Sequence, residues 1–483
     1  MRNSESLKLA IVLGLLVIPL FFVSLYSYQH APRIPFADQM LGSLRIAIKS
    51  YDGDLQFQDL WKQHNEHRIF FTRLVTATLA RTSHWNLRLE ASLSVALGVA
   101  NLVFFAFLLP RPRNRLSLFL LVPIAYLVLP LRLWGIWQNS FLNQHLFVVF
   151  FMLLALLSLQ KMPRGLAVLA VTAFWCFCAT ISVGTGLLSW LAIGSILVLR
   201  RNRQTGEILV WAALTCLSIT IYFHNFILKG HDPTDGSLGE KLVYALTFLG
   251  NPFVESGSQW IPVATFWGLF ALVTWSLCWY RILQLKPQRW NSLIWIAPGV
   301  FAIGAALLAT ISRSYIGSHQ ALISRYVVYS SLLWISLIFA VAQLLQVEPK
   351  TASRRWLRFS VIVISVVLSL FYIHSNISSW REPSSISPDL ENCFLQYPET
   401  GDFSCLSGLH EIFIPQSEDA SRRKNLLRRV RQLKKRRLTI FFDTETVTPP
   451  SMPLSTPTVP KPTQGSPTME IVSVLRESST CIR

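Results

Sequence analysis

One stretch near the N-terminus of the chain gathers side chains that could do chemistry. Carboxylates and imidazoles exchange protons with a substrate near neutral pH, and the planar fork of an arginine binds the oxygens of a phosphate. A loop that only joined two structural elements would not need so many of these groups together. The stretch contains Asp38, Asp52, Asp54, Asp59, His64, Asn65, Glu66, His67 and Arg68.

The two histidines of this stretch do not have the spacing of a zinc protease, which needs histidines four residues apart with a glutamate directly after the first. His64 and His67 are three residues apart, and Glu66 does not follow His64 directly. We expect residues 55–73 to form a helix, because they contain no Gly or Pro. At about 100° per residue, His64, His67 and Arg68 then share one face. Glu66 points away from that face. We interpret the face of His64, His67 and Arg68 as a surface that binds the phosphate or sugar of a substrate.

The composition of the chain excludes a water-soluble protein. Only 14% of its 483 residues are charged and 52% are hydrophobic, whereas a soluble protein carries about 25% charged residues. Its successive apolar runs, of about 18 to 22 residues, are each long enough to cross a bilayer as a helix. We therefore expect an all-α polytopic membrane protein with about 11 transmembrane helices. The expected spans are 7–26, 91–109, 116–134, 141–160, 165–180, 185–200, 207–226, 261–281, 291–312, 325–346 and 357–374.

The charges of the short connecting loops predict the orientation of these spans. Each even-numbered span is followed by a loop with Lys or Arg, for example Arg200 and Arg201 after the sixth, whereas the loops 135–140 and 181–184 carry no charge. Basic loops stay in the cytoplasm, so the N-terminus is expected there. The segments then expected outside are the long first loop 27–90, with amphipathic helices, the loops 227–260 and 313–324, and a small tail from 375.

More than half of the excess positive charge of the chain lies in one run of residues. The formal net charge is +19, and residues 421–437 hold ten Lys and Arg and no acid. Arg-rich loops of a membrane protein explain the remainder, so we expect no nucleic-acid partner. Leu426, Val430 and Leu433 recur at i, i+4 and i+7 within the run. This spacing predicts an amphipathic helix, which either lies on membrane lipids or is solvated.

The C-terminal part of the chain changes composition twice. We expect a transmembrane domain over 1–375, a small extracytoplasmic segment over 376–445, and a disordered Pro/Thr/Ser-rich tail over 446–483. Within the small segment, His410–Pro415 and Leu438–Phe442 have the apolar character of short strands. Cys393 and Cys405 lie in the same segment, and a disulfide between them stays open.

The order of these features resembles the GT-C superfamily of integral-membrane glycosyltransferases. The likeness covers roughly residues 1–375: a cytoplasmic N-terminus, a first span, a Pro-rich entry into an acid (residues 35–38, PFAD), a long first outer loop and many further spans. The run 64–70 (HNEHRIF) is similar to a motif of uncharacterised bacterial multipass proteins of this type. Asp38 is followed by Gln39, however, where the family commonly has Asp-Glu or Asp-x-Asp. Asp52-Gly53-Asp54 has the latter form, which a turn explains equally well.

The resemblance implies hexosyl or pentosyl transfer from a polyprenyl-phosphate donor to a lipid or glycan acceptor, at the outer face of the cell inner (plasma) membrane. Asp38 is the position that matches the general base of the family. A divalent metal ion held by Asp38 and another carboxylate or histidine stays open, and no cofactor is assigned. The residues expected to contact the donor are His64, Asn65, Glu66, His67, Arg68, Arg325 and Tyr326.

Two alternatives remain beside this interpretation. A lipid-linked saccharide polymerase or ligase would share the outer-face site but transfer a preassembled chain. A non-enzymatic transporter or flippase should carry charges near the middle of the bilayer, and often internal repeats. The expected spans contain almost no charges and no repeat, which disfavours a transporter.

Overall fold

The computed structural model describes residues 2–109, 115–163, 165–200, 204–227, 237–284, 290–347, 352–382, 386–402 and 420–443. The chain forms two compact units, each built from segments that are far apart in the sequence. The bundle unit consists of Met1–His30, Glu66–Thr72 and Ala91–Pro383, and the small unit of Ala31–Asn65, Arg73–Glu90 and Ser384–Arg483.

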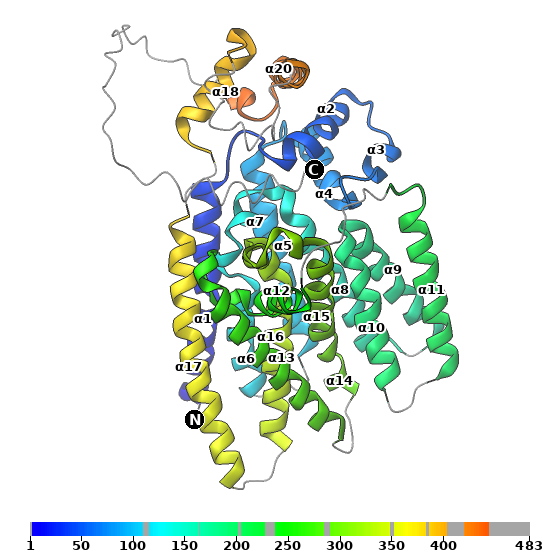
Figure 1. Ribbon diagram of the computed structural model, residues 1–483, viewed down its shortest axis with the longest axis vertical. Helices are drawn as coiled ribbons and strands as arrows, with labels where there is room; N and C mark the ends of the chain where they lie inside the picture. The colour runs from blue at the N-terminus through cyan, green and yellow to red at the C-terminus, as the bar shows by residue number, and fades with distance from the viewer. Residues whose placement is uncertain are drawn as a thin grey trace. The chain divides into compact units, whose positions relative to one another are not determined.

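Helices account for the regular structure of the bundle unit (Figure 1), and the described residues of the chain contain no strand. The helices in the first half are α1 (Arg2–His30), α5 (Leu87–Leu108), α6 (Arg115–Val128), α7 (Trp134–Gln138), α8 (Gln144–Lys161), α9 (Leu166–Ser182), α10 (Leu188–Leu199) and α11 (Thr205–Phe223). Those in the second half are α12 (Leu238–Gly250), α13 (Ile261–Gln284), α14 (Trp290–Leu293), α15 (Ile296–Arg313), α16 (Val327–Val347) and α17 (Ala352–Trp380).

The expected class, an all-α polytopic membrane protein, is confirmed. Within the described ranges, nine helical stretches are long and apolar enough to cross a membrane, and two shorter apolar helices accompany them at Leu166–Ser182 and Gly184–Leu199. The long stretches are Ala10–His30, Leu87–Leu108, Phe119–Gln138, Ser140–Lys161, Thr205–Phe223, Ser258–Gln284, Ile296–Ile316, Ser324–Gln346 and Phe359–Trp380.

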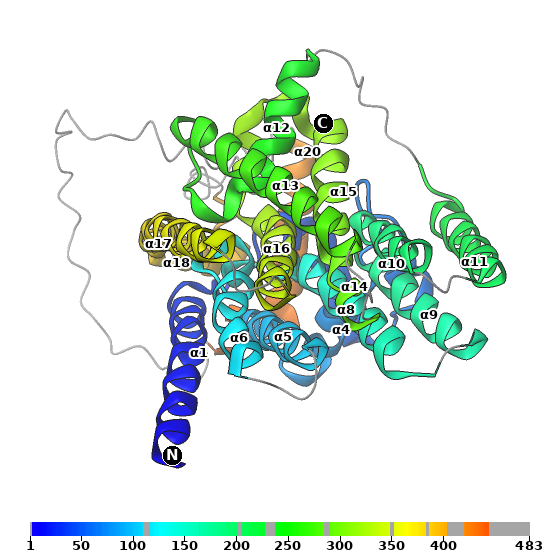
Figure 2. The same cartoon turned by 90° about the horizontal axis from the view of Figure 1, so that it is seen from below.

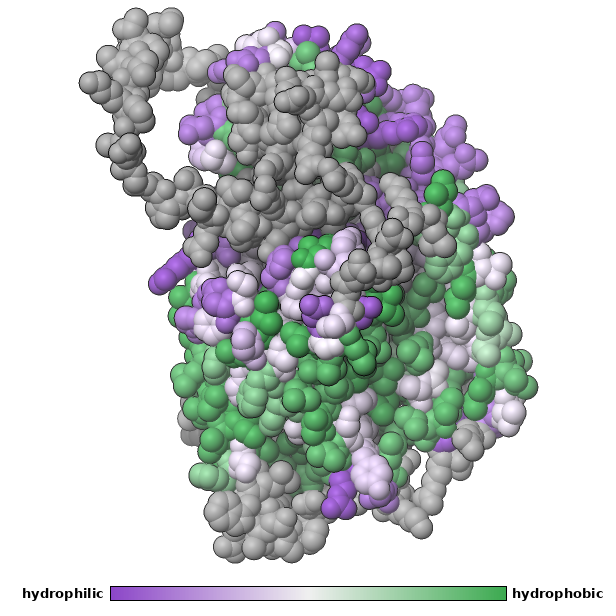
Figure 3. Space-filling model, in the orientation of Figure 1, coloured by the Kyte–Doolittle hydropathy of each residue, from purple (hydrophilic) through white to green (hydrophobic). Residues whose placement is uncertain are grey.

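The bundle unit has a protein-packed centre and an apolar outer surface. Helix α16 is surrounded by other helices of the bundle (Figure 2), and its Leu333 and Ile335 are fully buried. Helix α17, in contrast, exposes large side chains such as Phe359, Ile362 and Leu370. Hydrophobic residues cover much of the visible side of the bundle (Figure 3). An apolar surface of this extent requires lipid rather than water around it.

Helix α12 was not expected, because its residues fall in the polar loop predicted over 227–260. It starts with a capping box in which the backbone N–H of Ser237 donates to Glu240 at 2.8 Å. Two glycines then bring α12 against α13: a Cβ added to Gly250 would lie 1.9 Å from a backbone oxygen, and one added to Gly268 1.8 Å from another. The helices pack backbone to backbone, as small residues allow inside membranes.

The small unit has a hydrophobic core of its own. Its helical segments are α2 (Leu44–Asp52), α3 (Phe57–Trp61), most of α4 (Phe70–Thr82), α18 (Pro388–Thr400), α20 (Ala420–Lys435) and α21 (Ile440–Asp443), with a five-residue π-helix at Gln39–Ser43. The core combines residues of the first loop, such as Phe36 and Leu44, with Phe394 and Val430 from the C-terminal segment. Two segments that are far apart in the sequence, one ending at Glu90 and the other beginning at Ser384, therefore fold as one unit.

The predicted amphipathic helix of the basic run exists as α20, but its apolar face does not lie on lipid. Leu426, Val430 and Leu433 are buried in the core of the small unit. The opposite face exposes Lys424, Arg428 and other cations to the surroundings. The spacing correctly predicted a face that needs burial, but protein rather than membrane covers it.

Two further expectations for the C-terminal segment have different outcomes. The strand predicted over Leu438–Phe442 is wrong, because Thr439 has a left-handed φ of 56° and Ile440 begins α21. The other predicted strand, 410–415, lies outside the described residues. Cys393 is disulfide-bonded, and its partner also lies outside the described residues.

Candidate functional site

Residues 62–69 interrupt the helix that was expected over 55–73. Helix α3 ends at Trp61, and α4 does not begin until Phe70. Between them Asn65 has a left-handed backbone with φ 47°, which a continuous right-handed helix cannot contain. The prediction that the two histidines and the arginine of this run share one helical face is therefore wrong.

Arg73 provides the physical reason for this break. Its Nη1 atom donates to the carbonyl oxygens of Asp59 and Leu60, both at 3.3 Å, and to that of Lys62. The last carbonyls of a helix have no partner within the helix, so a buried cation that satisfies them stabilises the helix end. Arg73 is only 5% exposed and fixes the end of α3 in the small unit.

The run from His64 to Arg68 is divided between the two units. His64 and Asn65 belong to the small unit, whereas Glu66, His67 and Arg68 belong to the bundle unit. Each part has its own set of partners.

In the small unit, His64 pairs with Asp38, the residue proposed as general base. The Oδ1 atom of Asp38 lies 3.9 Å from Nε2 of His64. The side chain of Asp38 is 33% exposed, and that of His64 is 12% exposed. The carboxylate can therefore be reached by a hydroxyl group while the imidazole is held by the protein. A carboxylate in this setting can accept a proton from an acceptor hydroxyl.

The neighbouring carboxylates of the first loop have structural partners. Asp52 accepts two hydrogen bonds from the guanidinium of Arg436, at 2.7 and 2.6 Å, and these hold the pKa of Asp52 below its usual range. Gly53, with φ 86°, ends α2, so the Asp-x-Asp form at this place is a helix end. Asp59 accepts from Nζ of Lys49 at 2.7 Å with both oxygens.

In the bundle unit, Glu66 forms an ion pair with Arg313 at the end of α15. The distance from Oε2 of Glu66 to Nη2 of Arg313 is 3.0 Å. The two side chains are 29% and 13% exposed, so water screens the pair less than it screens a surface pair. This contact anchors the segment Glu66–Thr72 within the bundle unit.

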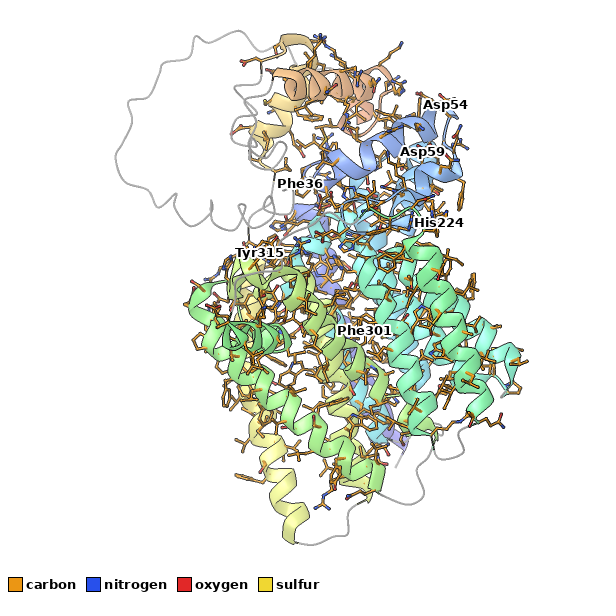
Figure 4. The ribbon with its side chains drawn as sticks, turned by 45° about the vertical axis from the view of Figure 1, so that its right-hand side comes forward. Phe36, Asp54, Asp59, His224, Phe301 and Tyr315 are labelled. Carbon is orange, nitrogen blue, oxygen red and sulfur yellow. The ribbon has the colours of Figure 1, made fainter. Side chains whose placement is uncertain are left out.

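Arg68 closes the end of α11, a role different from the phosphate contact expected for it. Its Nε donates to the carbonyl of Tyr222 at 2.8 Å, and its Nη2 to that of His224 at 2.6 Å. His224 lies at the end of this helix in Figure 4. Arg68 is 3% exposed, and this burial lowers its pKa. Two of the five N–H groups of the Arg68 guanidinium thus donate hydrogen bonds to backbone carbonyls.

His67 lies in a space that a glycine provides. A Cβ added to Gly184 would lie 3.0 Å from Nδ1 of His67 and 3.2 Å from the hydroxyl oxygen of Tyr222. A larger residue at this position would press on both side chains. The link between α9 and α10, in which Gly184 begins the short helix η4 (Gly184–Leu187), therefore shapes the surroundings of His67.

Arg325 and Tyr326 precede α16, and Arg325 interacts electrostatically with a histidine that the sequence did not single out. The guanidinium carbon of Arg325 lies 5.6 Å from the centre of the Tyr326 ring. Arg325 and His67 both interact electrostatically with His145, near the start of α8. His145 is only 7% exposed. Arg325, which precedes α16, and His67, from the segment Glu66–Thr72, thus both act electrostatically on the first turn of α8.

These groups form a cationic cluster where several apolar helices of the bundle unit begin or end. Both arginines of the group, Arg313 and Arg325, interact electrostatically with the buried phenol of Tyr244. Tyr315, just beyond the end of α15, marks this end of the helix in Figure 4, and Phe301 lies within the bundle. We call Glu66, His67, His145, Arg313 and Arg325 the cationic cluster.

Sequence reasoning missed His145 together with two residues bonded to it, Tyr329 and Thr185. His145 and Tyr329 lie in apolar runs, and Thr185 lies in an uncharged link, so neither charge nor periodicity singled them out. The only signal was an imidazole at the mouth of an expected span, where ionisable groups are uncommon.

Comparison with protein families, with curated proteins and with solved structures found no match for this chain. Among the described residues, no group of three or more His, Cys, Asp and Glu side chains is arranged to hold a metal ion.

Proposed function

We propose that the protein is a glycosyltransferase that moves a sugar from a polyprenyl-phosphate donor to a lipid or glycan acceptor. The observation that carries this proposal is the cationic cluster in the bundle unit. Ionisable groups within membrane-spanning segments, such as His145 in the stretch Ser140–Lys161, are rare and usually functional. Arg313 and Arg325 supply planar donors suited to phosphate oxygens, and the two histidines supply further hydrogen bonds.

In the proposed reaction, the oxygen of an acceptor hydroxyl attacks the anomeric carbon of the donor sugar. The bond from that carbon to the phosphate oxygen breaks, and its electron pair leaves with the polyprenyl phosphate. Cationic groups stabilise the charge that develops on this leaving group. The proton of the acceptor hydroxyl is proposed to pass to Asp38, the position that matches the general base of the GT-C superfamily and whose side chain is 33% exposed.

The proposed location is the inner membrane of a bacterium, with the small unit facing outside. Two independent features support this orientation. The basic residues of the connecting loops alternate as the positive-inside pattern requires. Cys393 of the small unit is disulfide-bonded, and disulfides persist in oxidising compartments rather than in the cytoplasm.

Turnover by the purified full chain tests the proposal. The protein is incubated in detergent with polyprenyl-phosphate hexoses and pentoses together with a panel of lipid and glycan acceptors, and released polyprenyl phosphate is measured by mass spectrometry. Replacing Asp38 by Asn should lower the rate by about 100-fold or more, as loss of a general base does. The matched control is Asp54→Asn, which removes an exposed carboxylate of the same loop and should keep the activity. Full activity of Asp38→Asn contradicts the assignment of the base.

The same assay separates the alternatives. Transfer of a preassembled oligosaccharide, with no transfer of single sugars, favours a lipid-linked saccharide polymerase or ligase. Binding of the donor lipids without any release of polyprenyl phosphate favours a lipid transporter or flippase and contradicts the transferase proposal.

A further inference from the structure

Three side chains form a buried chain of hydrogen bonds within the bundle unit. The Nδ1 atom of His145 lies 2.8 Å from the hydroxyl oxygen of Tyr329, and that oxygen lies 2.7 Å from Oγ1 of Thr185. Tyr329 is 1% exposed, and Thr185 is half-buried. These hydrogen bonds connect three elements: α8, α16 and the short helix η4. Tyr329 is 184 residues from His145 and 144 residues from Thr185.

The rings of His145 and Tyr329 pack against each other and against a neighbouring aromatic ring. The ring of His145 meets that of Tyr329 edge to face, with centres 5.5 Å apart. Phe301 of α15, labelled in Figure 4, also packs on Tyr329, with ring centres 5.6 Å apart. Because burial fixes the ring of Tyr329, its hydroxyl oxygen stays in position to bond Nδ1 of His145.

The hydrogen bond at Nδ1 determines what the other nitrogen of His145 can do. In a neutral imidazole one nitrogen carries a proton and the other accepts. When Thr185 donates to Tyr329 and Tyr329 donates to Nδ1, the proton of the imidazole lies on Nε2. A histidine whose Nδ1 is bonded in this way presents an N–H donor of fixed direction.

The surroundings of His145 suit a negatively charged ligand. Arg325 and His67 both interact electrostatically with His145, and Arg325 also with Tyr329. Ionisable side chains within membrane-spanning segments are rare and costly, and they usually face the interior of the bundle and serve a function. A network that only joined helices would not need cations beside it.

We propose that Thr185 and Tyr329 position His145 so that its Nε2–H donates to a phosphate oxygen of an isoprenoid lipid phosphate that Arg325 also contacts. This inference rests on the proposed function and deepens it. His145 is a substrate-binding residue here, and Tyr329 and Thr185 are positioning residues that act through it. The ligand is the phosphate group on its lipid, rather than free phosphate.

Binding to the full-length protein in detergent, measured by native mass spectrometry, tests this inference. The probes are polyprenyl phosphate, the uncharged polyprenol and inorganic phosphate. His145→Gln should weaken binding of polyprenyl phosphate by about tenfold, as the loss of one hydrogen bond to a charged group does. Binding of polyprenol should not change. Inorganic phosphate that competes at the same concentration as the lipid phosphate would overturn the lipid as the ligand.

Tyr329→Phe separates positioning from a merely structural role, because it removes only the hydroxyl. In the wild-type background it should weaken binding of polyprenyl phosphate by about three- to tenfold, and in the His145→Gln background it should have no further effect. Tyr280→Phe, at a tyrosine exposed on α13, is the matched control and should change nothing. If Tyr329→Phe fails to fold, Thr185→Val replaces it and should act in the same way.

Failure of this inference can be distinguished from failure of the proposed function. If the wild-type protein binds polyprenyl phosphate no better than polyprenol, the donor site itself is refuted. If Arg325→Gln weakens binding of the lipid phosphate but His145→Gln and Tyr329→Phe do not, only the inference about His145 is overturned. Equal effects of Tyr329→Phe in both backgrounds also overturn it, since the hydroxyl then acts independently of His145.

Discussion

Replacing Glu66 by Gln and Arg313 by Gln, singly and together, measures the ion pair that anchors the segment Glu66–Thr72 within the bundle unit. The two charged atoms are 3.0 Å apart. At an effective dielectric constant of about 20, Coulomb's law gives an attraction of about 5.5 kcal/mol at this distance. Both side chains are partly exposed, so solvent screening and the ordering of the side chains reduce the net contribution to about 1–2 kcal/mol.

The assay is unfolding of the purified full chain by SDS in mixed micelles, followed by tryptophan fluorescence. Each single variant should lose about 1–2 kcal/mol of the free energy of unfolding, and the double variant should lose little more than either single one. The exchanged pair, Glu66→Arg with Arg313→Glu, should recover part of the loss. Glu399 and Lys434 form an exposed pair in the small unit and serve as control, where we expect no measurable coupling.

Strict additivity of the two single effects would refute the reasoning. In that case Glu66 and Arg313 stabilise the protein independently, and the ion pair does not anchor the segment that carries His67 and Arg68. A loss of the coupling at high salt, with retention at low salt, would instead agree with a partly screened pair.

Two further predictions concern stability, and a third concerns the disulfide of Cys393. Because hydrogen bonds from its arginine partner lower the pKa of Asp52, its stabilisation is present above the ordinary aspartate pKa of about 3.9 and is lost as the pH falls through the lowered value. The melting temperature of Asp52→Asn should therefore fall less steeply in acid than that of the wild type, and parallel curves would contradict this. Gly268→Ala places a Cβ 1.8 Å from the carbonyl oxygen of Leu246 and should lower the free energy of unfolding by about 2 kcal/mol or more. Gly206→Ala adds a Cβ in open space and should not lower it. Equal melting temperatures of the two variants would argue against the close helix contact. Alkylation of Cys393 should occur only after reduction, as peptide mass spectrometry would detect.

The membrane helices could be predicted from the sequence because lipid leaves few alternatives. Backbone polar groups in a bilayer must be satisfied within the segment, so a long apolar run is almost forced to be helical. The runs that became α8 and α16 illustrate this, since each contains an unbroken apolar stretch. Helix α12 escaped prediction because its polar flanks gave it the character of a loop.

Local periodicity failed where a distant side chain decides the backbone. Nothing within residues 55–69 predicts the end of α3, because Arg73 supplies the donor that caps it. On α20, the apolar spacing correctly identified the face of Val430 and Leu433 but could not identify what covers it. A hydrophobic face shows that burial is needed, and only the tertiary structure shows whether lipid or protein provides it.

The candidate site was only partly accessible to sequence reasoning. Asp38 and His64 were both singled out, and the structure pairs them within the small unit. His145 and Tyr329 are 184 residues apart, and no motif connects them. Contacts of this length depend on how the helices pack, which a single sequence does not encode in any local pattern.

Transfer of sugar from a polyprenyl-phosphate donor is the most direct test of the central claim. The measurement compares release of polyprenyl phosphate by the wild-type protein with release by Asp38→Asn and by Arg325→Gln. We predict release by the wild type, a loss of about 100-fold or more in Asp38→Asn, and slower release by Arg325→Gln at low donor concentration because donor binding is weaker. Absence of release from every hexosyl and pentosyl donor, by a folded wild-type protein, would contradict the account.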